Sequence, residues 1–410
     1  MIHPQDIRIS DYTYRLPQDK IAAFPLEKRD ESKLLVYKEG EISESKFLNL
    51  NDHLPAGTTL VFNDTRVVRA RLLFNKPTGA KIEIFCLDEG MGQDVQLAFA
   101  RHGSVKWKCL VGNARRWQSG ILTRKIETTD GELILNAEIL ERLDDEWLIS
   151  FSWEPAGLSF CEVLELAGKV PLPPYISREA DENDVTRYQT IYACNNGSVA
   201  APTAGLHFSE SLLGKLKLNN IKREYLTLHV GAGTFKPVST ERIGEHLMHR
   251  EMITVTKPTL LALLKNGQQR IFAVGTTSLR TLESLYWFGA KLIKKQNDDG
   301  LEIHQWDPYG ALNENPVTPA EALEAILKYM DKAGKTSISG FTNLMIVPGY
   351  QFRLCQGLIT NFHQPQSTLL LLVAAFIGPG WRDVYDYALN HNFRFLSYGD
   401  ACLFYLNNKC

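Results

Sequence analysis

The pattern of hydrophobic residues changes near Trp153, and this change constrains the fold more than any other feature of the chain. Before it, short runs typical of β-strands, such as 81–85 and 105–110, are separated by turns that contain glycine. Alternating short strands and turns at this spacing are typical of a small antiparallel barrel. We therefore predict a β-barrel domain over residues 65–153.

After Trp153, helix-like and strand-like segments alternate along the chain. The clearest helix-like segments are 208–217, 276–290 and 366–377, and the clearest strand-like segments are 224–230, 270–275 and 357–361. Such alternation predicts a sheet with helices packed on it. A polar stretch over 291–337 resembles an insertion into this α/β part.

Length and composition limit the class of protein. A chain of 410 residues is expected to form two or three domains. Its 44% hydrophobic and 22% charged residues are typical of a soluble globular protein. No stretch reaches the roughly 18 consecutive apolar residues that a membrane span needs, and the first residues lack the apolar core of a signal peptide. We expect a cytoplasmic protein without a membrane partner.

Several familiar motifs are absent. The seven cysteines are scattered and form no C-x-x-C pair, which argues against a disulfide framework or a thiolate zinc site. His246 and His249 lie near Glu245, but H-E-x-x-H does not occur. The sequence at 334–336 lacks the first glycine of a P-loop, and that at 231–233 lacks the third glycine of a dinucleotide fingerprint. We expect no metal site and no resident cofactor.

Charges are segregated along the predicted barrel. Residues 66–125 carry a net charge of +8, and residues 126–150 carry −7, although the whole chain carries only −2. One interpretation is a phosphate-binding face on which Trp107 and Trp117 offer stacking surfaces. The other is that the barrel strands fold these charges together and cancel them. The sequence leaves both interpretations open.

Residues 199–208 form a stretch in which small side chains predominate, and it leads through His207 into the helix-like segment. Small residues and Gly allow the backbone to approach another surface closely. The stretch is therefore either a ligand-facing loop or a tightly packed corner with a core histidine. Alone, it does not decide between them.

Three histidines have similar surroundings. His207 follows the small-residue stretch, and His229 and His363 each end a strand-like run next to Gly or Pro. Polar side chains at strand ends are where open α/β sheets assemble ligand sites. We therefore predict that the three histidines share one pocket.

Another strand-like run ends at Gly275 and is followed by Thr276, Thr277, Ser278 and Arg280. Hydroxyl groups and backbone N–H groups at the start of a helix suit a carboxylate or phosphate, and an arginine adds a bidentate partner. An ordinary helix cap with an unrelated arginine is the alternative. Asp400 follows a glycine in an otherwise apolar segment, so it is either a turn residue or a catalytic acid.

Eight blocks of the sequence, taken together and in order, carry a resemblance to a known family. The blocks are 60–67 (LVFNDTRV), 171–176 (PLPPYI), 188–192 (YQTIY), 200–208 (AAPTAGLHF), 228–235 (LHVGAGTF), 274–280 (VGTTSLR), 360–363 (TNFH) and 397–401 (SYGDA). The chain closely resembles the S-adenosylmethionine:tRNA ribosyltransferase-isomerase family of queuosine biosynthesis. The resemblance covers about residue 10 to residue 406, except 291–337.

The resemblance implies an α/β fold in which one discontinuous domain, 1–64 and 154–410, is interrupted by the β-barrel at 65–153. It implies a transferase that moves the ribosyl part of S-adenosylmethionine onto a 7-aminomethyl-7-deazaguanine base at the tRNA wobble position. Isomerisation then gives epoxyqueuosine and releases adenine and methionine. Its partners would be S-adenosylmethionine, which is consumed as a substrate, and tRNA carrying the precursor base. We expect a monomer.

Roles for individual residues follow from this chemistry. Histidine suits removal of the C5′ proton and protonation of adenine, because its pKa lies near neutral pH. We predict His207, His229 and His363 as the acid/base set, with Asp400 orienting a histidine or binding the base or ribose. Thr277, Ser278 and Arg280 are predicted to hold the methionine carboxylate. The other predicted substrate-binding residues are Thr203, Gly205, Gly231, Gly233, Thr276 and Asn361. Asn63, Asp64 and Arg66 are predicted to lie at the domain junction, where tRNA would bridge the domains.

Some positions differ from the usual family pattern, namely Arg69, Thr186, Gln356, Gln364 and Gln366. Most of these differences change charge near the expected site or RNA surface, so they concern the substrate more than the fold. Two alternatives follow: a divergent paralogue that acts on another RNA or on a nucleoside, and an RNA-binding module without catalysis.

Overall fold

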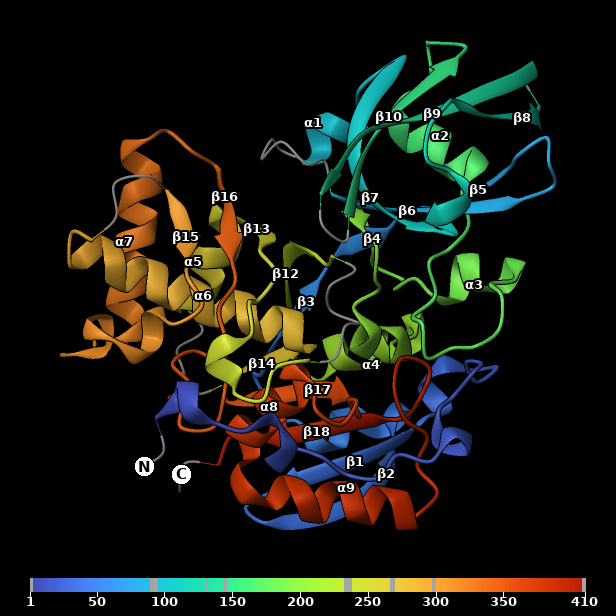
Figure 1. Cartoon of the computed structure of the whole chain (residues 1–410). Helices are drawn as coiled ribbons and strands as arrows, with labels where there is room; N and C mark the ends of the chain where they lie inside the picture. The colour runs from blue at the N-terminus through green and yellow to red at the C-terminus, as the bar shows by residue number, and fades with distance from the viewer. Residues whose placement is uncertain are drawn as a thin grey trace.

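The computed structural model describes residues 3–88, 95–129, 131–143, 146–231, 238–265, 270–296 and 300–407. A six-stranded sheet stands apart from a larger α/β body, and the two are joined near β4 (Figure 1), which pairs with β11. The strands are β1 (Lys33–Lys38), β2 (Glu41–Lys46), β3 (Thr59–Asn63), β4 (Thr65–Val67), β5 (Arg71–Asn75), β6 (Lys81–Asp88), β7 (Ser104–Gly112), β8 (Leu122–Thr128), β9 (Gly131–Leu143), β10 (Glu146–Glu154), β11 (Asn195–Ser198), β12 (Lys222–His229), β13 (Glu251–Thr256), β14 (Ile271–Val274), β15 (Leu301–Ile303), β16 (Ser337–Thr342), β17 (Gly357–Asn361) and β18 (Ala401–Tyr405).

The large sheet has the strand order β15-β16-β13-β12-β3-β14-β17-β18-β1-β2. Its centre, from β12 through β3 and β14 to β17, is parallel, and antiparallel pairs flank it on both sides. Each residue of β3, β14 and β17 is buried, as expected for parallel strands covered on both faces. Because these strands are parallel, their carboxyl ends meet at one edge of the sheet.

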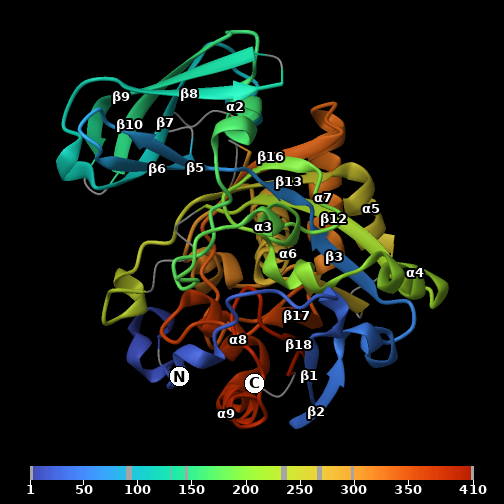
Figure 2. The same cartoon turned by 90° about the vertical axis from the view of Figure 1, so that its right-hand side faces the viewer.

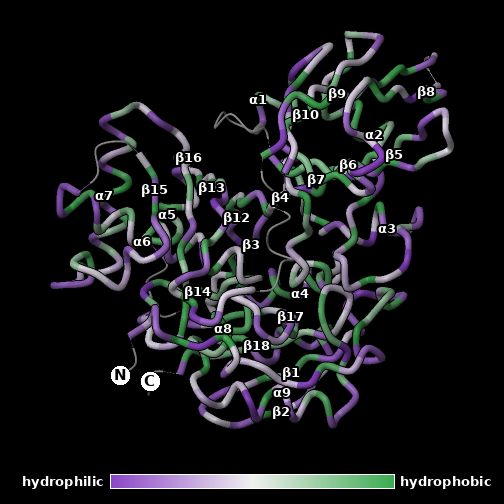
Figure 3. Tube along the Cα trace, viewed as in Figure 1, coloured by the Kyte–Doolittle hydropathy of each residue, from purple (hydrophilic) through white to green (hydrophobic). Residues whose placement is uncertain are grey.

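Helices cover both faces of the large sheet (Figure 2). The α-helices are α1 (Val95–Phe99), α2 (Phe160–Ala167), α3 (Glu182–Arg187), α4 (Glu210–Leu218), α5 (Lys257–Lys265), α6 (Thr276–Ile293), α7 (Pro319–Lys332), α8 (Thr368–Ile377) and α9 (Trp381–Asn390). Successive side chains of a strand point to opposite faces of the sheet, so each central strand contributes to two hydrophobic cores, one on each face. Val61 packs with residues of α6 and α8, whereas Leu60 and Phe62 pack with residues of α4 on the other face. Hydrophobic segments accordingly run through the middle of this body (Figure 3).

The small sheet is antiparallel, with the order β5-β6-β7-β10-β9-β8. Its edge strands approach each other, since Arg124 of β8 donates to the carbonyl oxygen of Leu73 in β5 at 3.2 Å. The same guanidinium nitrogen donates to the carbonyl oxygen of Ala167 at the end of α2, at 2.7 Å. The sheet is therefore nearly closed, with α2 packed into its core through residues such as Phe160.

The predicted fold class, an α/β body with a small antiparallel barrel, is confirmed. The barrel strands run from Arg71 to Glu154; the boundaries 65 and 153 stay predictions. The segment 291–337 contains the end of α6, the edge strand β15 and helix α7. Its assignment as an insertion also stays a prediction. Among the described residues, no helix is both long and apolar enough to cross a membrane.

Candidate active site

A pocket of about 80 Å³ lies at the carboxyl edge of the parallel strands. The segments that line it lie at the carboxyl ends of β12 (Val230), β14 (Gly275–Thr277) and β17 (360–364). The small-residue stretch at 200–204, Tyr175 and residues 396–397 complete the lining. The carboxyl ends of these three strands therefore meet at one cavity. Its volume is below the roughly 300–1,000 Å³ of sites that enclose a drug-sized ligand, so this pocket encloses only part of a molecule that size.

The N-terminus of α6 forms one wall of the pocket. Gly275 caps the helix with φ at +91°, a backbone conformation that favours glycine. Thr276 and Thr277 line the pocket, and the first backbone N–H groups of a helix have no partner within it. The hydroxyl oxygen of Thr277 is buried and has no hydrogen-bond partner among the described residues. This wall therefore suits an anionic group of a ligand.

The other two residues predicted to hold the carboxylate do not line the pocket. Ser278 donates its hydroxyl to the carbonyl oxygen of Val274, the last residue of β14, at 2.8 Å. Arg280 forms a buried ion pair with Glu251 of β13 at 2.5 Å. Both side chains therefore have their partners within the protein. For Arg280 this partner is needed, because a buried guanidinium requires a compensating charge.

His207 is buried and both ring nitrogens have partners. Ser32 Oγ lies 2.9 Å from Nδ1, and Asn361 Nδ2 lies 3.1 Å from Nε2. The Asn361 amide group also donates to the carbonyl oxygen of Leu396 at 3.2 Å, which fixes its nitrogen toward the ring. Nε2 must therefore accept, and the imidazole carries its proton on Nδ1. Burial, with the nearby charge of Arg394, lowers the pKa of His207 to about 3.

Asn361 connects His207 to the pocket. Its Oδ1 accepts a hydrogen bond from Thr203 Oγ1 at 2.9 Å, and both residues line the cavity. His207 therefore lies behind the pocket wall and orients Asn361. This geometry supports the packing-corner interpretation for His207 and the ligand-loop interpretation for Thr203.

His363 is the predicted histidine that lines the pocket. Its Nε2 lies 2.8 Å from Thr360 Oγ1. Its backbone is held by two tyrosines, because the N–H donates to Tyr385 Oη at 3.1 Å and the carbonyl accepts from Tyr14 Oη at 2.5 Å. Burial lowers the pKa of His363 to about 3, so the ring is neutral near pH 7.

His229 faces the junction between the two bodies. Thr65 Oγ1 of β4 lies 3.1 Å from its Nδ1, and Gln96 Nε2 of α1 lies 3.4 Å from its Nε2. The ring also lies against Gly197, where an added Cβ would be 2.5 Å from Nδ1. The prediction that the three histidines share one pocket is therefore wrong, because their side chains point to three different surroundings. Their catalytic roles stay predictions.

Among the described residues, no hydrogen bond or ion pair joins Asp400 to a histidine. Its carboxylate accepts the backbone N–H groups of Lys33 at 3.1 Å and Arg394 at 2.8 Å, and the Arg394 guanidinium at 3.2 Å. These contacts place it as the anchor of the turn before β18.

Gly205, one of the glycines predicted to bind substrate, packs behind the pocket, where an added Cβ would lie 2.0 Å from Tyr192 Oη. Gly231 is partly exposed beside Val230, and Gly233 lies outside the described residues.

The residues predicted at the domain junction differ in their environments. Asn63 is buried and exchanges hydrogen bonds with the backbone of Leu228, at 2.9 and 3.0 Å, so it joins β3 to β12. Asp64 accepts a hydrogen bond from Thr227 at 2.7 Å. Arg66 on β4 is exposed. Of the three, Arg66 is the side chain most available to a partner.

The structure also corrects the predictions about the tryptophans and the charges of the barrel. Trp107 and Trp117 are 1% and 0% exposed, so they belong to the barrel core and offer no stacking surface. Part of the positive charge is cancelled by cross-strand pairs, such as Arg71 with Glu83 at 2.7 Å and Lys125 with Glu132 at 2.9 Å. Exposed Arg115 and Arg116 have no ion pair among the described residues.

Sequence reasoning missed Tyr175, Ser397 and Thr360 as pocket residues. Tyr175 Oη lies 2.6 Å from Ser397 Oγ, and burial raises the pKa of Tyr175 to about 12. The proline-rich context before Tyr175, at 171–174, was the available signal, because prolines restrict the backbone of the segment that leads to this ring. Among the described residues, no group of three or more potential metal ligands occurs.

Comparison with known proteins shows which family the chain belongs to. A family model described as queuosine biosynthesis protein matches residues 9–404. The S-adenosylmethionine:tRNA ribosyltransferase-isomerase of Aromatoleum aromaticum is 38% identical over 96% of both chains, and that of Syntrophomonas wolfei is 39% identical over 97% of both. The crystal structure of S-adenosylmethionine tRNA ribosyltransferase from Thermotoga maritima is 27% identical, covers 96% of this chain and 100% of its own, and has a TM-score of 0.45. With matches along nearly its whole length, the chain belongs to the queuosine biosynthesis protein family.

Proposed function

We propose that this protein is an S-adenosylmethionine:tRNA ribosyltransferase-isomerase. It transfers and isomerises the ribosyl group of S-adenosylmethionine onto 7-aminomethyl-7-deazaguanine at the wobble position of tRNA, giving epoxyqueuosine and releasing adenine and methionine. One observation carries this proposal: four S-adenosylmethionine:tRNA ribosyltransferase-isomerases are 36–39% identical to this chain and match it over 96–97% of its length.

The N-terminus of α6 provides the site for the methionine carboxylate of the substrate. The backbone N–H groups of its first turn and the buried Thr277 hydroxyl are donors beside the pocket. A buried hydroxyl without a partner costs about 1–3 kcal/mol, and an accepting carboxylate oxygen would remove that cost. Arg280 supports this wall indirectly, because its pair with Glu251 joins α6 to β13.

The histidines act from different positions. His363 reaches the substrate as a neutral imidazole. Because its pKa is about 3, the ring is a weak base near pH 7, and its main role is to form hydrogen bonds with the substrate. His207 positions Asn361 and Thr203. His229 stands where the barrel meets the α/β body. S-adenosylmethionine is consumed as a substrate, with no further cofactor, and the tRNA reaches the pocket from the barrel side. A monomeric state and a cytoplasmic location stay predictions.

Adenine release tests this function. The protein is incubated with S-adenosylmethionine and either tRNA that carries the precursor base or the same tRNA with guanine at the wobble position. Adenine should form only with the first. Release with another RNA or with a nucleoside would indicate a divergent paralogue, and no release under any condition would exclude both enzymatic alternatives.

Thr277→Val tests the carboxylate site separately from the fold. Valine removes a buried hydroxyl that lacks a partner, so the free energy of unfolding should stay the same or rise. The KM for S-adenosylmethionine should rise about tenfold or more, because a hydrogen bond to a charged group contributes about 1.5–3 kcal/mol.

Thr281→Val is the matched control for this experiment. It is buried one turn further along α6, and its hydroxyl donates to the carbonyl oxygen of Thr277 at 3.0 Å without lining the pocket. Its KM should match that of the wild type. An unchanged KM in Thr277→Val would remove the hydroxyl from the carboxylate site.

A further inference from the structure

A second, smaller cavity lies on the other side of His207 from the active-site pocket. It has a volume of about 20 Å³, and its polar lining includes Arg29, Arg187 and Arg394. Ser397 lines both cavities, so a single side chain separates them at this point. A volume of this size admits one water-sized group, such as one oxygen atom of a larger anion that approaches from outside.

Arg394 is paired with Asp400 at 3.2 Å, but the other two arginines of this cavity, Arg29 and Arg187, have no ion-pair partner among the described residues. Arg29 and Arg187 are both half-buried, and burial together with the charge of Arg187 lowers the pKa of Arg29. Their hydrogen bonds go to backbone carbonyl oxygens: Arg29 donates to Gln189 at 3.2 Å, and Arg187 donates to Glu27 at 2.8 Å and to Leu26. Neither forms an ion pair among the described residues, and Arg187 Nε is buried without a partner there.

The acidic groups around the cavity already have other partners. Asp400 accepts the Arg394 guanidinium, but it also accepts two backbone N–H groups. Asp30, whose charge acts on Arg29, accepts the hydroxyl of Ser209 at 2.5 Å. Two like charges held close together in a half-buried site are costly without an anion to compensate them.

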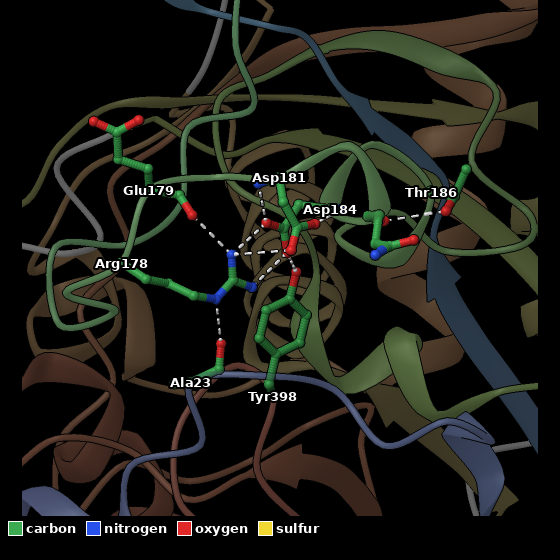
Figure 4. Close-up of polar contacts among 8 residues, drawn as sticks. Ala23, Arg178, Glu179, Asp181, Asp184, Thr186 and Tyr398 are labelled. Carbon is green, nitrogen blue, oxygen red and sulfur yellow. Dashed lines mark hydrogen bonds and ion pairs between the residues drawn. The ribbon is translucent and has the colours of Figure 1, made fainter.

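Another buried carboxylate, Asp184, is held in a hydrogen-bond network that includes the cavity residue Tyr398 (Figure 4). It accepts Arg178 through both oxygens at 2.6 and 2.8 Å, Tyr398 Oη at 2.7 Å and the backbone N–H of Asp181 at 2.9 Å. Burial alone would raise the pKa of Asp184, but these hydrogen bonds hold it below its usual value. Arg178 therefore neutralises Asp184, and the network positions α3, whose last residue is Arg187.

We propose that Arg29, Arg187 and Arg394 form a phosphate-binding site for the backbone of the RNA substrate, adjacent to the nucleotide whose base occupies the active-site pocket. The assignment rests on the proposed function. Guanidinium groups match phosphate oxygens bidentately, and contacts to phosphates fix the register of a nucleic acid on a protein. A nucleotide that inserts its base on one side of Ser397 brings its own phosphate to the other side.

Arg29→Gln tests the site, with Arg29→Lys and Arg382→Gln as controls. Lysine keeps the charge, and Arg382 is an exposed arginine on α9 that is not among the residues lining the cavity. The dissociation constant for precursor tRNA is measured between 50 and 300 mM KCl. Arg29→Gln should weaken binding by about tenfold and lower the slope of log K against log salt by about one. Both controls should keep the wild-type slope, and circular dichroism should show all variants folded.

Two further measurements separate the possible outcomes. Titration with inorganic phosphate alone distinguishes a free anion from an RNA phosphodiester: phosphate binding that needs Arg29, with an unchanged tRNA slope in Arg29→Gln, would overturn the RNA assignment. An unchanged slope without phosphate binding would overturn the site altogether. Wild-type protein that binds tRNA but releases no adenine would instead contradict the proposed function, and the slope would still decide the phosphate site.

Discussion

Mild acid should destabilise this protein through two buried histidines before its carboxylates become protonated. His207 and His363 have pKa values of about 3 in the folded protein against a usual 6.5, chiefly because burial disfavours the charged imidazole. Below pH 6.5 the unfolded chain therefore binds protons that the folded chain does not. This contribution to stability is present above pH 6.5 and is lost progressively as the pH falls toward 3.

The magnitude follows from the pKa difference. Each histidine contributes about 1.4 kcal/mol per pH unit once the pH is well below 6.5. Lowering the pH from 7.5 to 5.0 should therefore reduce the free energy of unfolding by about 2 kcal/mol for each histidine, or about 4 kcal/mol for both. Total stabilities of about 5–15 kcal/mol are usual, so the effect is a large share of the total.

Urea unfolding at pH 7.5, 6.5, 5.5 and 5.0 measures this effect. His207→Asn and His363→Asn should each reduce the pH dependence by about 2 kcal/mol over this range. His304→Asn, at an exposed histidine, should leave it unchanged. Equal pH dependence in the wild type and both buried variants would refute the conclusion that these histidines are held neutral.

Three further perturbations test other parts of the structure. Gly205→Ala should lower the free energy of unfolding by about 1–3 kcal/mol, measured by urea unfolding, because its Cβ would lie 2.0 Å from a tyrosine oxygen; wild-type stability would contradict the close packing. Glu251→Gln should cost about 3–5 kcal/mol in the same assay, since it leaves the buried Arg280 without its counter-charge, and a loss below 1 kcal/mol would show that the pair is hydrated. Charge reversal at both Arg115 and Arg116 should weaken tRNA binding and flatten its salt dependence, whereas an unaltered salt slope would favour cancellation of the barrel charges.

The sequence predicts the location of the pocket because the location depends on local patterns. Buried runs that end in Gly275 and Asn361 identify parallel strands, and parallel strands place their carboxyl ends together. The direction of each side chain beyond those ends depends on partners distant in sequence. His207 turns toward Ser32, and Arg280 turns toward Glu251. No local pattern contains those pairings.

One error was avoidable from the sequence alone. Along β7, Val105, Trp107 and Cys109 are buried and alternate with Lys106 and Lys108, which follows the period of two of a half-buried strand. The alternation therefore assigns Trp107 to the core and the lysines to the outside. In contrast, the clustering of three arginines around the second cavity joins segments near residues 29, 187 and 394. Only the folded chain brings these segments together.

Isotope transfer from S-adenosylmethionine to tRNA tests the central claim most directly. S-adenosylmethionine labelled with ¹⁴C in the ribose is compared with the same compound labelled in the methyl group, each with tRNA that carries the precursor base. The ribose label should enter the tRNA in step with adenine release, and the methyl label should not enter it. Methyl label in the tRNA, or no transfer of ribose label, would contradict the central claim.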